Sequence, residues 1–130
     1  NKEGLKPNEV FDYELPEEIK KDLIYLEGKW KSNKDNLEAV EDSSVVLSFT
    51  ANKINIVGDA LEDPVNLEVL IDGEYVKEEQ AGDDAVFENG KAFVLVDEPR
   101  LYNVVNGEYG NFKLTLFAKN GFTFHAFTFG

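Results

Sequence analysis

Several residue types that support particular chemistries are absent or rare in this chain of 130 residues. It has no cysteine, which excludes disulfides and thiol chemistry within it and leaves its redox compartment undetermined. It has no methionine and begins at Asn1, so we expect a mature or excised segment rather than an intact gene product. No apolar run approaches the roughly 20 residues that a membrane-spanning helix needs. Direct membrane insertion is therefore not expected.

The charge balance limits the partners of the chain. It carries 26 acidic and 13 basic side chains, which give a formal net charge of −13. Because such a surface repels phosphate groups, nucleic acid and anionic membranes are not expected to bind it. The length suits one domain with a single hydrophobic core.

Residues suited to catalysis or metal binding are few. His125 is the single histidine, and it lacks a nearby second metal ligand or a nucleophile with a plausible base. Asp83 and Asp84 form an acidic pair after Gly82, but the D-x-D-x-D-G pattern of a calcium loop is absent. So are a glycine-rich phosphate loop, a G-x-S-x-G elbow and an H-E-x-x-H motif. We expect no enzyme activity, no cofactor and no metal. A glycosidase with two carboxylates across a cleft is the least favoured alternative.

Alternation of apolar and polar residues is the main pattern that is present, and its period of two is typical of half-buried β-strands. The clearest strand is predicted at residues 44–50, and another at residues 112–116. Asn120-Gly121 then predicts a tight hairpin into a phenylalanine-rich strand that ends at Phe129. The phenylalanines of this last strand change parity, which indicates either a bulge near His125-Ala126 or burial of both faces. We expect this strand inside the sheet, because an exposed edge this apolar invites aggregation.

The turns predict the fold class. Glycine-marked turns at positions 58, 73, 90, 107 and 121 separate about nine or ten short strands, without a long helix between them. The hairpin signals are Asp72-Gly73, Asn89-Gly90, Asn106-Gly107 and Asn120-Gly121, and Asn52-Lys53 is compatible with a further turn. This rhythm predicts an all-β fold, an antiparallel two-sheet β-sandwich of jelly-roll topology, over residues 23–130. Residues 1–22 are polar, contain Pro7 and Pro16, and are expected to form an N-terminal linker or arm.

Two kinds of residue are candidates for ligand binding. They are aromatic side chains that carry one polar atom, and Arg100, the only arginine. Such rings can stack on the apolar face of a sugar or fill the edge of a core, and the core is favoured for Trp30. Tyr109, between two glycines, is the ring expected to be most exposed. Arg100 can hold the carboxylate of Asp83 or Asp84, in a bridge between two loops or as part of a ligand site. The candidates are Trp30, Arg100, Tyr102, Tyr109 and Asp83.

Several short motifs together resemble a known family. They are L-x-G-x-W at 26–30, L-x-F-x-A at 47–51, A-G-x-D at 81–84, R-L-Y at 100–102 and the terminal F-T-F-G. In this order, with Asp72-Gly73, they resemble the C-terminal domain of DipZ-type exported thioredoxin-family proteins. His125 departs from the pattern, since an aromatic residue such as tyrosine would be expected there.

The resemblance implies a jelly-roll domain similar to a carbohydrate-binding module, attached after a thioredoxin domain. It also implies an extracytoplasmic location, periplasmic or at the cell envelope. Any thiol-disulfide exchange would belong to the thioredoxin-like domain of the parent chain, whose C-x-x-C is absent here. We therefore expect a non-catalytic accessory domain with carbohydrate as a possible ligand. The alternative is a protein-interaction or scaffold domain that shapes the substrate face of the neighbouring thioredoxin domain.

Overall fold

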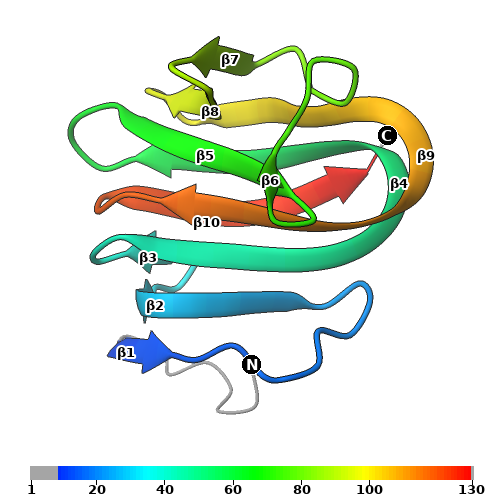
Figure 1. Cartoon of the computed structure of the whole chain (residues 1–130). Coiled ribbons are helices and arrows are strands. Elements are labelled where there is room, and N and C mark those ends of the chain that lie inside the picture. The colour runs from blue at the N-terminus through cyan, green and yellow to red at the C-terminus, as the bar shows by residue number, and fades with distance from the viewer. Residues whose placement is uncertain (1–8, 130) are drawn as a thin grey trace.

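The structure, a computed structural model, describes residues 9–129, and these residues form β-strands and connecting loops without a helix (Figure 1). None of them therefore lies in a helix long and apolar enough to span a membrane. The ten strands are β1 (Val10–Tyr13), β2 (Ile24–Ser32), β3 (Leu37–Ala39), β4 (Ser43–Ala60), β5 (Val65–Ile71), β6 (Glu74–Tyr75), β7 (Ala85–Glu88), β8 (Lys91–Val96), β9 (Arg100–Ala118) and β10 (Phe122–Phe129). The predicted all-β class is confirmed.

The strands pair antiparallel in one continuous sheet that closes like a barrel. Its order is β1-β2-β3-β10-β4-β9-β5-β8-β7, with β6 beside β5. Strand β2 also pairs with β4, so β2, β3, β10 and β4 close a ring of hydrogen-bonded neighbours. The prediction of two separate sheets in jelly-roll order is not confirmed, because β4 and β9 run without a break from one side of the barrel to the other.

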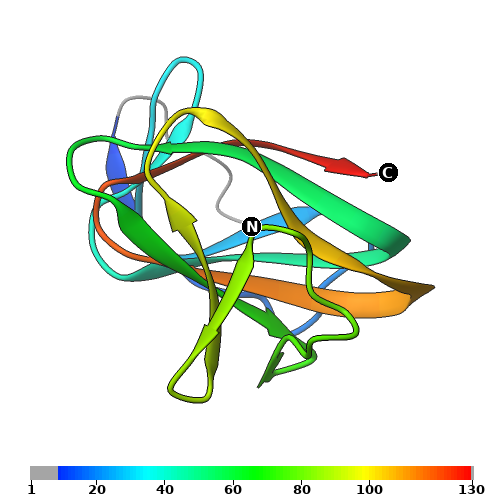
Figure 2. The ribbon, with the colours of Figure 1, turned by 90° about the horizontal axis from the view of Figure 1, so that it is seen from above.

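Strands β4 and β9 connect the two sides of the barrel. They span 18 and 19 residues and bend together at one end of the molecule (Figures 1 and 2). The first half of β4 pairs with β2, whereas its second half pairs with β10. Between the halves the β4–β9 register shifts at Ala51/Lys53, where residues 107–109 of β9 lie opposite Asn52 alone. The predicted turns at Asn52-Lys53 and Asn106-Gly107 are therefore wrong, and both positions lie at a bend within continuous strands.

Alternate residues of the strands form the core, as their sequence pattern predicts. Val45, Leu47 and Phe49 of β4 are buried, and so are Leu114 and Leu116 of β9. The paired residues Val45 and Leu116, and likewise Leu47 and Leu114, point to the same side. The largest fully buried side chains are Trp30, Tyr13, Tyr102, Phe49 and Phe122.

The C-terminal strand β10 lies inside the sheet only over its first half. Thr123 and Phe124 have β3 on one side and β4 on the other. A register shift between Phe124 and Ala126 leaves His125 unpaired, which confirms the predicted bulge. From Ala126 to Phe129, β10 pairs with β4 but with no other strand of residues 9–129. The expectation of a central or well-covered strand is therefore wrong for this second half.

The segment predicted as an N-terminal arm contributes a strand to the sheet. Within it β1 pairs with β2, and Tyr13 is buried. A bridge from Lys21 to Ser48 holds the segment against β4. The boundary between Asp22 and Leu23 stays a prediction.

Candidate functional site

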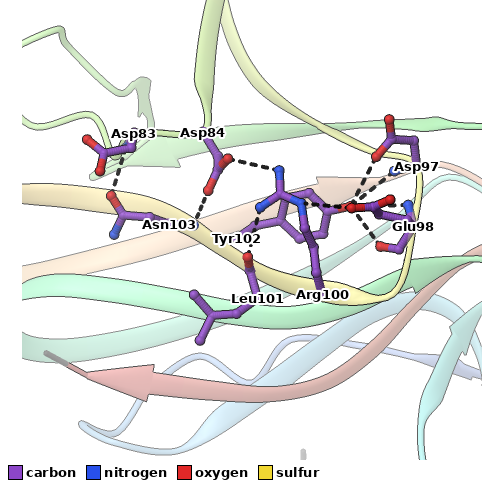
Figure 3. Close-up of polar contacts among 8 residues, drawn as sticks. All are labelled: Asp83, Asp84, Asp97, Glu98, Arg100, Leu101, Tyr102 and Asn103. Carbon is purple, nitrogen blue, oxygen red and sulfur yellow. Dashed lines mark hydrogen bonds and ion pairs between the residues drawn. The ribbon is translucent and has the colours of Figure 1, made fainter.

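The predicted residue Arg100 lies at the centre of a polar network at the start of β9 (Figure 3). Its Nη2 donates a hydrogen bond of 2.9 Å to Oδ1 of Asp84, and its Nη1 donates one of 2.9 Å to the carbonyl of Leu101. The guanidinium carbon lies 3.8 Å from the ring centroid of Tyr102, in cation–π contact. Glu98 approaches Nε at 3.8 Å. The guanidinium is therefore held from several sides by the protein itself.

Asp84 joins this network to the next residues of β9. Its Oδ2 accepts a hydrogen bond of 2.7 Å from the backbone N–H of Asn103. Burial raises the pKa of the Asp84 carboxyl, but the hydrogen bonds from Arg100 and Asn103 outweigh burial, and the pKa is lowered overall. Asp83 takes part through its backbone, whose N–H donates to Oδ1 of Asn103 at 2.7 Å, and its side chain is exposed. Asp84 rather than Asp83 is thus the partner of Arg100, in a bridge that ties the loop before β7 to the start of β9.

Tyr102 is fully buried, so its ring is not available to stack on a ligand. Its hydroxyl donates to the carbonyl of Glu98 at 2.8 Å and accepts from the backbone N–H groups of Asp97 and Glu98 at 3.1 and 3.2 Å. These bonds satisfy the backbone of the turn that precedes β9. Tyr102 is therefore corrected from a ligand-stacking residue to a core residue. It pairs with Ile56 across the strands, and its ring points into the core.

The other two predicted rings lie on different elements. Trp30 is fully buried in β2, and its Nε1 donates to the carbonyl of Glu27 at 3.1 Å, which confirms the core position favoured for it and leaves no open ring for a ligand. Tyr109 lies at the bend of β9 and is 74% exposed, which confirms the predicted exposure. The structure therefore brings Arg100, Tyr102 and the Asp83-Asp84 turn together, but it builds no row of open aromatic rings from the predicted set.

A groove on the outer face of β5 and β8 collects residues that the sequence analysis missed. It has a volume of about 340 Å³ and is lined by Asn66, Glu68, Glu88, Asn89, Lys91, Phe93 and Lys119. Register explains the grouping, because Glu68 of β5 pairs with Phe93 of β8 and both point away from the core. A second groove, of about 470 Å³, shares Glu88, Asn89 and Lys91 and adds Tyr75 and Phe87. The two grooves meet at the β7–β8 hairpin.

Glu68 is the most constrained charge in this groove. The hydroxyl of Tyr75 donates to its Oε1 at 2.5 Å, and Nζ of Lys91 lies 3.8 Å from its Oε2. The side chain of Glu68 is only 17% exposed. The hydrogen bond to Glu68, followed by burial and the charge of Glu68, raises the pKa of the Tyr75 phenol. Tyr75 therefore remains a protonated donor at neutral pH.

The sequence contained a partial signal for this groove. Glu68 stands at an outward position of β5 between the buried residues Leu67 and Val69, and the Asp72-Gly73 hairpin returns Tyr75 toward it. Only the register between β5 and β8, which joins distant parts of the chain, adds Phe93 and Lys91.

The arrangement is suited to holding a ligand through hydrogen bonds and one ring face. Among residues 9–129, no three His, Asp or Glu side chains gather closely enough to hold a metal ion. Carboxylate, amide and ammonium groups beside an aromatic ring instead provide acceptors, donors and an apolar surface at one place.

Comparison with known proteins addresses the identity of the chain. No curated protein matches it. The model of a protein family described as the thioredoxin-like C-terminal domain matches residues 1–130. With its all-β fold, the chain thus belongs to the thioredoxin-like C-terminal domain family.

Proposed function

We propose that this chain is a non-catalytic accessory domain of a DipZ-type exported thioredoxin-family protein and that it binds carbohydrate. Its family membership supports the accessory role, since a family described as a thioredoxin-like C-terminal domain is consistent with an accessory domain. The extracytoplasmic location, periplasmic or at the cell envelope, is part of the proposal. Thiol-disulfide exchange would take place in the thioredoxin-like domain, because this chain has no cysteine.

The groove around Glu68 is the observation that carries carbohydrate binding. A sugar presents hydroxyl groups around its rim and C–H groups on its face. Glu68 accepts hydroxyl hydrogen bonds, Asn66 and Asn89 both donate and accept them, and Lys91 donates. Phe93 supplies an apolar ring for the C–H face. Each element of sugar recognition is thus present on one surface.

The hydrogen bond from Tyr75 makes Glu68 suitable for binding a ligand. It fixes the carboxylate in one orientation before a ligand arrives, which lowers the entropy cost of binding. We propose that Glu68 serves as a fixed hydrogen-bond acceptor for ligand hydroxyl groups, with Tyr75 and Lys91 beside it.

A glycan array followed by calorimetric titration tests the proposal. We expect the wild-type chain to bind at least one glycan and the Glu68→Gln variant to lose about tenfold in affinity, since a hydrogen bond to a charged group contributes about 1.4 kcal/mol or more. Glu74→Gln is the matched control, because Glu74 is an exposed residue of β6 that does not line the groove. No binding by the wild type, equal loss in both variants, or release of reducing sugar would contradict the proposal.

Exposed aliphatic side chains at the start of β2 favour a second candidate, a scaffold that contacts the thioredoxin-like domain. Leu23 and Ile24 are 51% and 40% exposed and adjacent, where the N-terminal segment joins the sheet. In the parent protein, Leu23→Glu should weaken the contact and lower thermal stability. Leu61→Glu, at a comparably exposed leucine in another loop, should not. Equal effects of the two substitutions would remove this candidate.

A further inference from the structure

The second half of β10 is an open sheet edge with an unusual composition. Over residues 126–129, β10 pairs with β4 and with no other strand of the described chain. Ala126, Thr128 and Phe129 are exposed, and Phe129 retains 52% of its accessible surface. Such an edge presents unpaired backbone N–H and C=O groups to another strand.

The other edges of the sheet carry charges that this one lacks. Edge strand β1 contains Asp12, and edge strand β7 ends at Glu88. Charged side chains on an edge oppose pairing with a further strand. By contrast, β10 contains no Asp, Glu, Lys or Arg, although the whole chain has a net charge of −13. It is therefore the edge at which two copies can meet without placing like charges opposite each other.

We propose that two copies of this chain pair through β10, antiparallel and across a two-fold axis, to form a weak dimer. An axis at Thr128 places Phe127 of each copy opposite Phe129 of the other. Aromatic and threonine cross-strand pairs both favour antiparallel pairing. The hydroxyl of Thr128 accepts a hydrogen bond of 3.2 Å from Nδ2 of Asn55, which leaves its own proton for a partner across the axis. The edge shared by residues 127–129 of each copy is three residues long and extends about 10 Å.

Charge determines how the dimer responds to salt. The apolar edge attracts, but the bodies of the two copies repel each other, since each carries −13. Salt screens this repulsion, with a Debye length that falls from about 14 Å at 0.05 M to about 4 Å at 0.5 M. The dimer is thus stronger at high salt. A basic protein bound at the same edge would show the opposite dependence.

Analytical ultracentrifugation of the full chain tests the proposal. Over concentrations from about 10 μM to about 1 mM, we expect the dimer fraction to rise with concentration and, at fixed concentration, with salt. Phe129→Lys should leave a monomer under all conditions. Val86→Lys is the matched control, since Val86 is 43% exposed on edge strand β7, and it adds the same charge. It should retain the dimer.

Circular dichroism shows whether each variant is folded, and Phe129→Ser replaces Phe129→Lys if the lysine disturbs the sheet. A wild-type chain that is monomeric throughout would overturn the proposal. So would a dimer that survives substitution of Phe129, or one that weakens as salt is added. The test does not depend on the glycan experiments, because Phe129 does not line the Glu68 groove.

Discussion

The ion pair between Asp84 and Arg100 yields a prediction with a defined magnitude and pH dependence. Asp84 accepts from Arg100 Nη2 and from the Asn103 N–H, and Asn in its place keeps the shape but loses the charge. A hydrogen bond to a charged group contributes about 1.5–3 kcal/mol, whereas exposed ion pairs contribute about 0.2–1 kcal/mol. The Asp84 and Arg100 side chains are 25% and 40% exposed, which is between these cases. We expect Asp84→Asn to lower the free energy of unfolding by about 1–2 kcal/mol at pH 7.

The sign of the pH dependence follows from the lowered pKa of Asp84 in the folded state. A carboxylate whose folded pKa lies below its unfolded value stabilises the protein above the unfolded pKa, which is about 4. This stabilisation is lost as the pH falls through the folded pKa. Asn does not titrate, so the difference between wild type and Asp84→Asn should be full at pH 7 and shrink below about pH 4.

Urea denaturation at a series of pH values measures this difference. Asp83→Asn is the control, because Asp83 contributes its backbone N–H rather than its carboxylate to the network. Its effect should stay within about 0.5 kcal/mol. A difference for Asp84→Asn that is the same at pH 7 and pH 3.5, or equal to that for Asp83→Asn, would refute a structural ion pair at this position.

Three further substitutions test other parts of the structure. Tyr102→Phe should lower the free energy of unfolding, measured by urea denaturation, by about 1–3 kcal/mol, because it leaves backbone groups of residues 97 and 98 unpaired. A change below about 0.5 kcal/mol would contradict the assigned hydrogen bonds. Gly82→Ala should lower the free energy of unfolding by about 1–3 kcal/mol or more, because the added Cβ would lie 2.2 Å from the carbonyl oxygen of Asn103. Unchanged thermal stability of this variant would show that the loop is not packed there. Tyr109→Ser should change stability by less than about 0.5 kcal/mol and leave glycan affinity unaltered. A loss of affinity in that variant would move the site to the bend of β9.

Two of the predicted hairpins show where local sequence was a sufficient guide, whereas the hairpin predicted at Asn120-Gly121 is wrong, because this turn joins β9 to β10 and β4 lies between them. Asp72 and Gly73 both adopt positive φ, as do Asn89 and Gly90, which is the conformation of a type I′ turn. Asn106-Gly107 carries the same signal, yet Gly107 does not adopt positive φ. A Cβ on Gly107 would lie 3.1 Å from backbone atoms of residues 79 and 80, so this glycine permits a close approach of a loop. Pairing between β4 and β9 overrode the local turn preference.

The candidate site was less accessible to sequence reasoning than the fold. The single arginine and the acidic pair at 83–84 predicted a bridge, because an arginine and an aspartate that both lie beside turns can form an ion pair, as Arg100 and Asp84 do. Burial of Trp30 and Tyr102 depends on which face of a strand points inward, and their strands contain apolar residues of both parities. The Glu68 groove depends on which distant strand pairs with β5, and no local pattern specifies that partner.

Carbohydrate recognition at the Glu68 groove is the central claim, and titration of the ¹⁵N-labelled chain with a glycan identified on the array tests it most directly. We expect saturable chemical-shift changes centred on Asn66, Glu68 and Phe93, with unaltered signals at Arg100 and Tyr109. Changes centred on Arg100 or Tyr109, or no saturable change with any glycan, would contradict it.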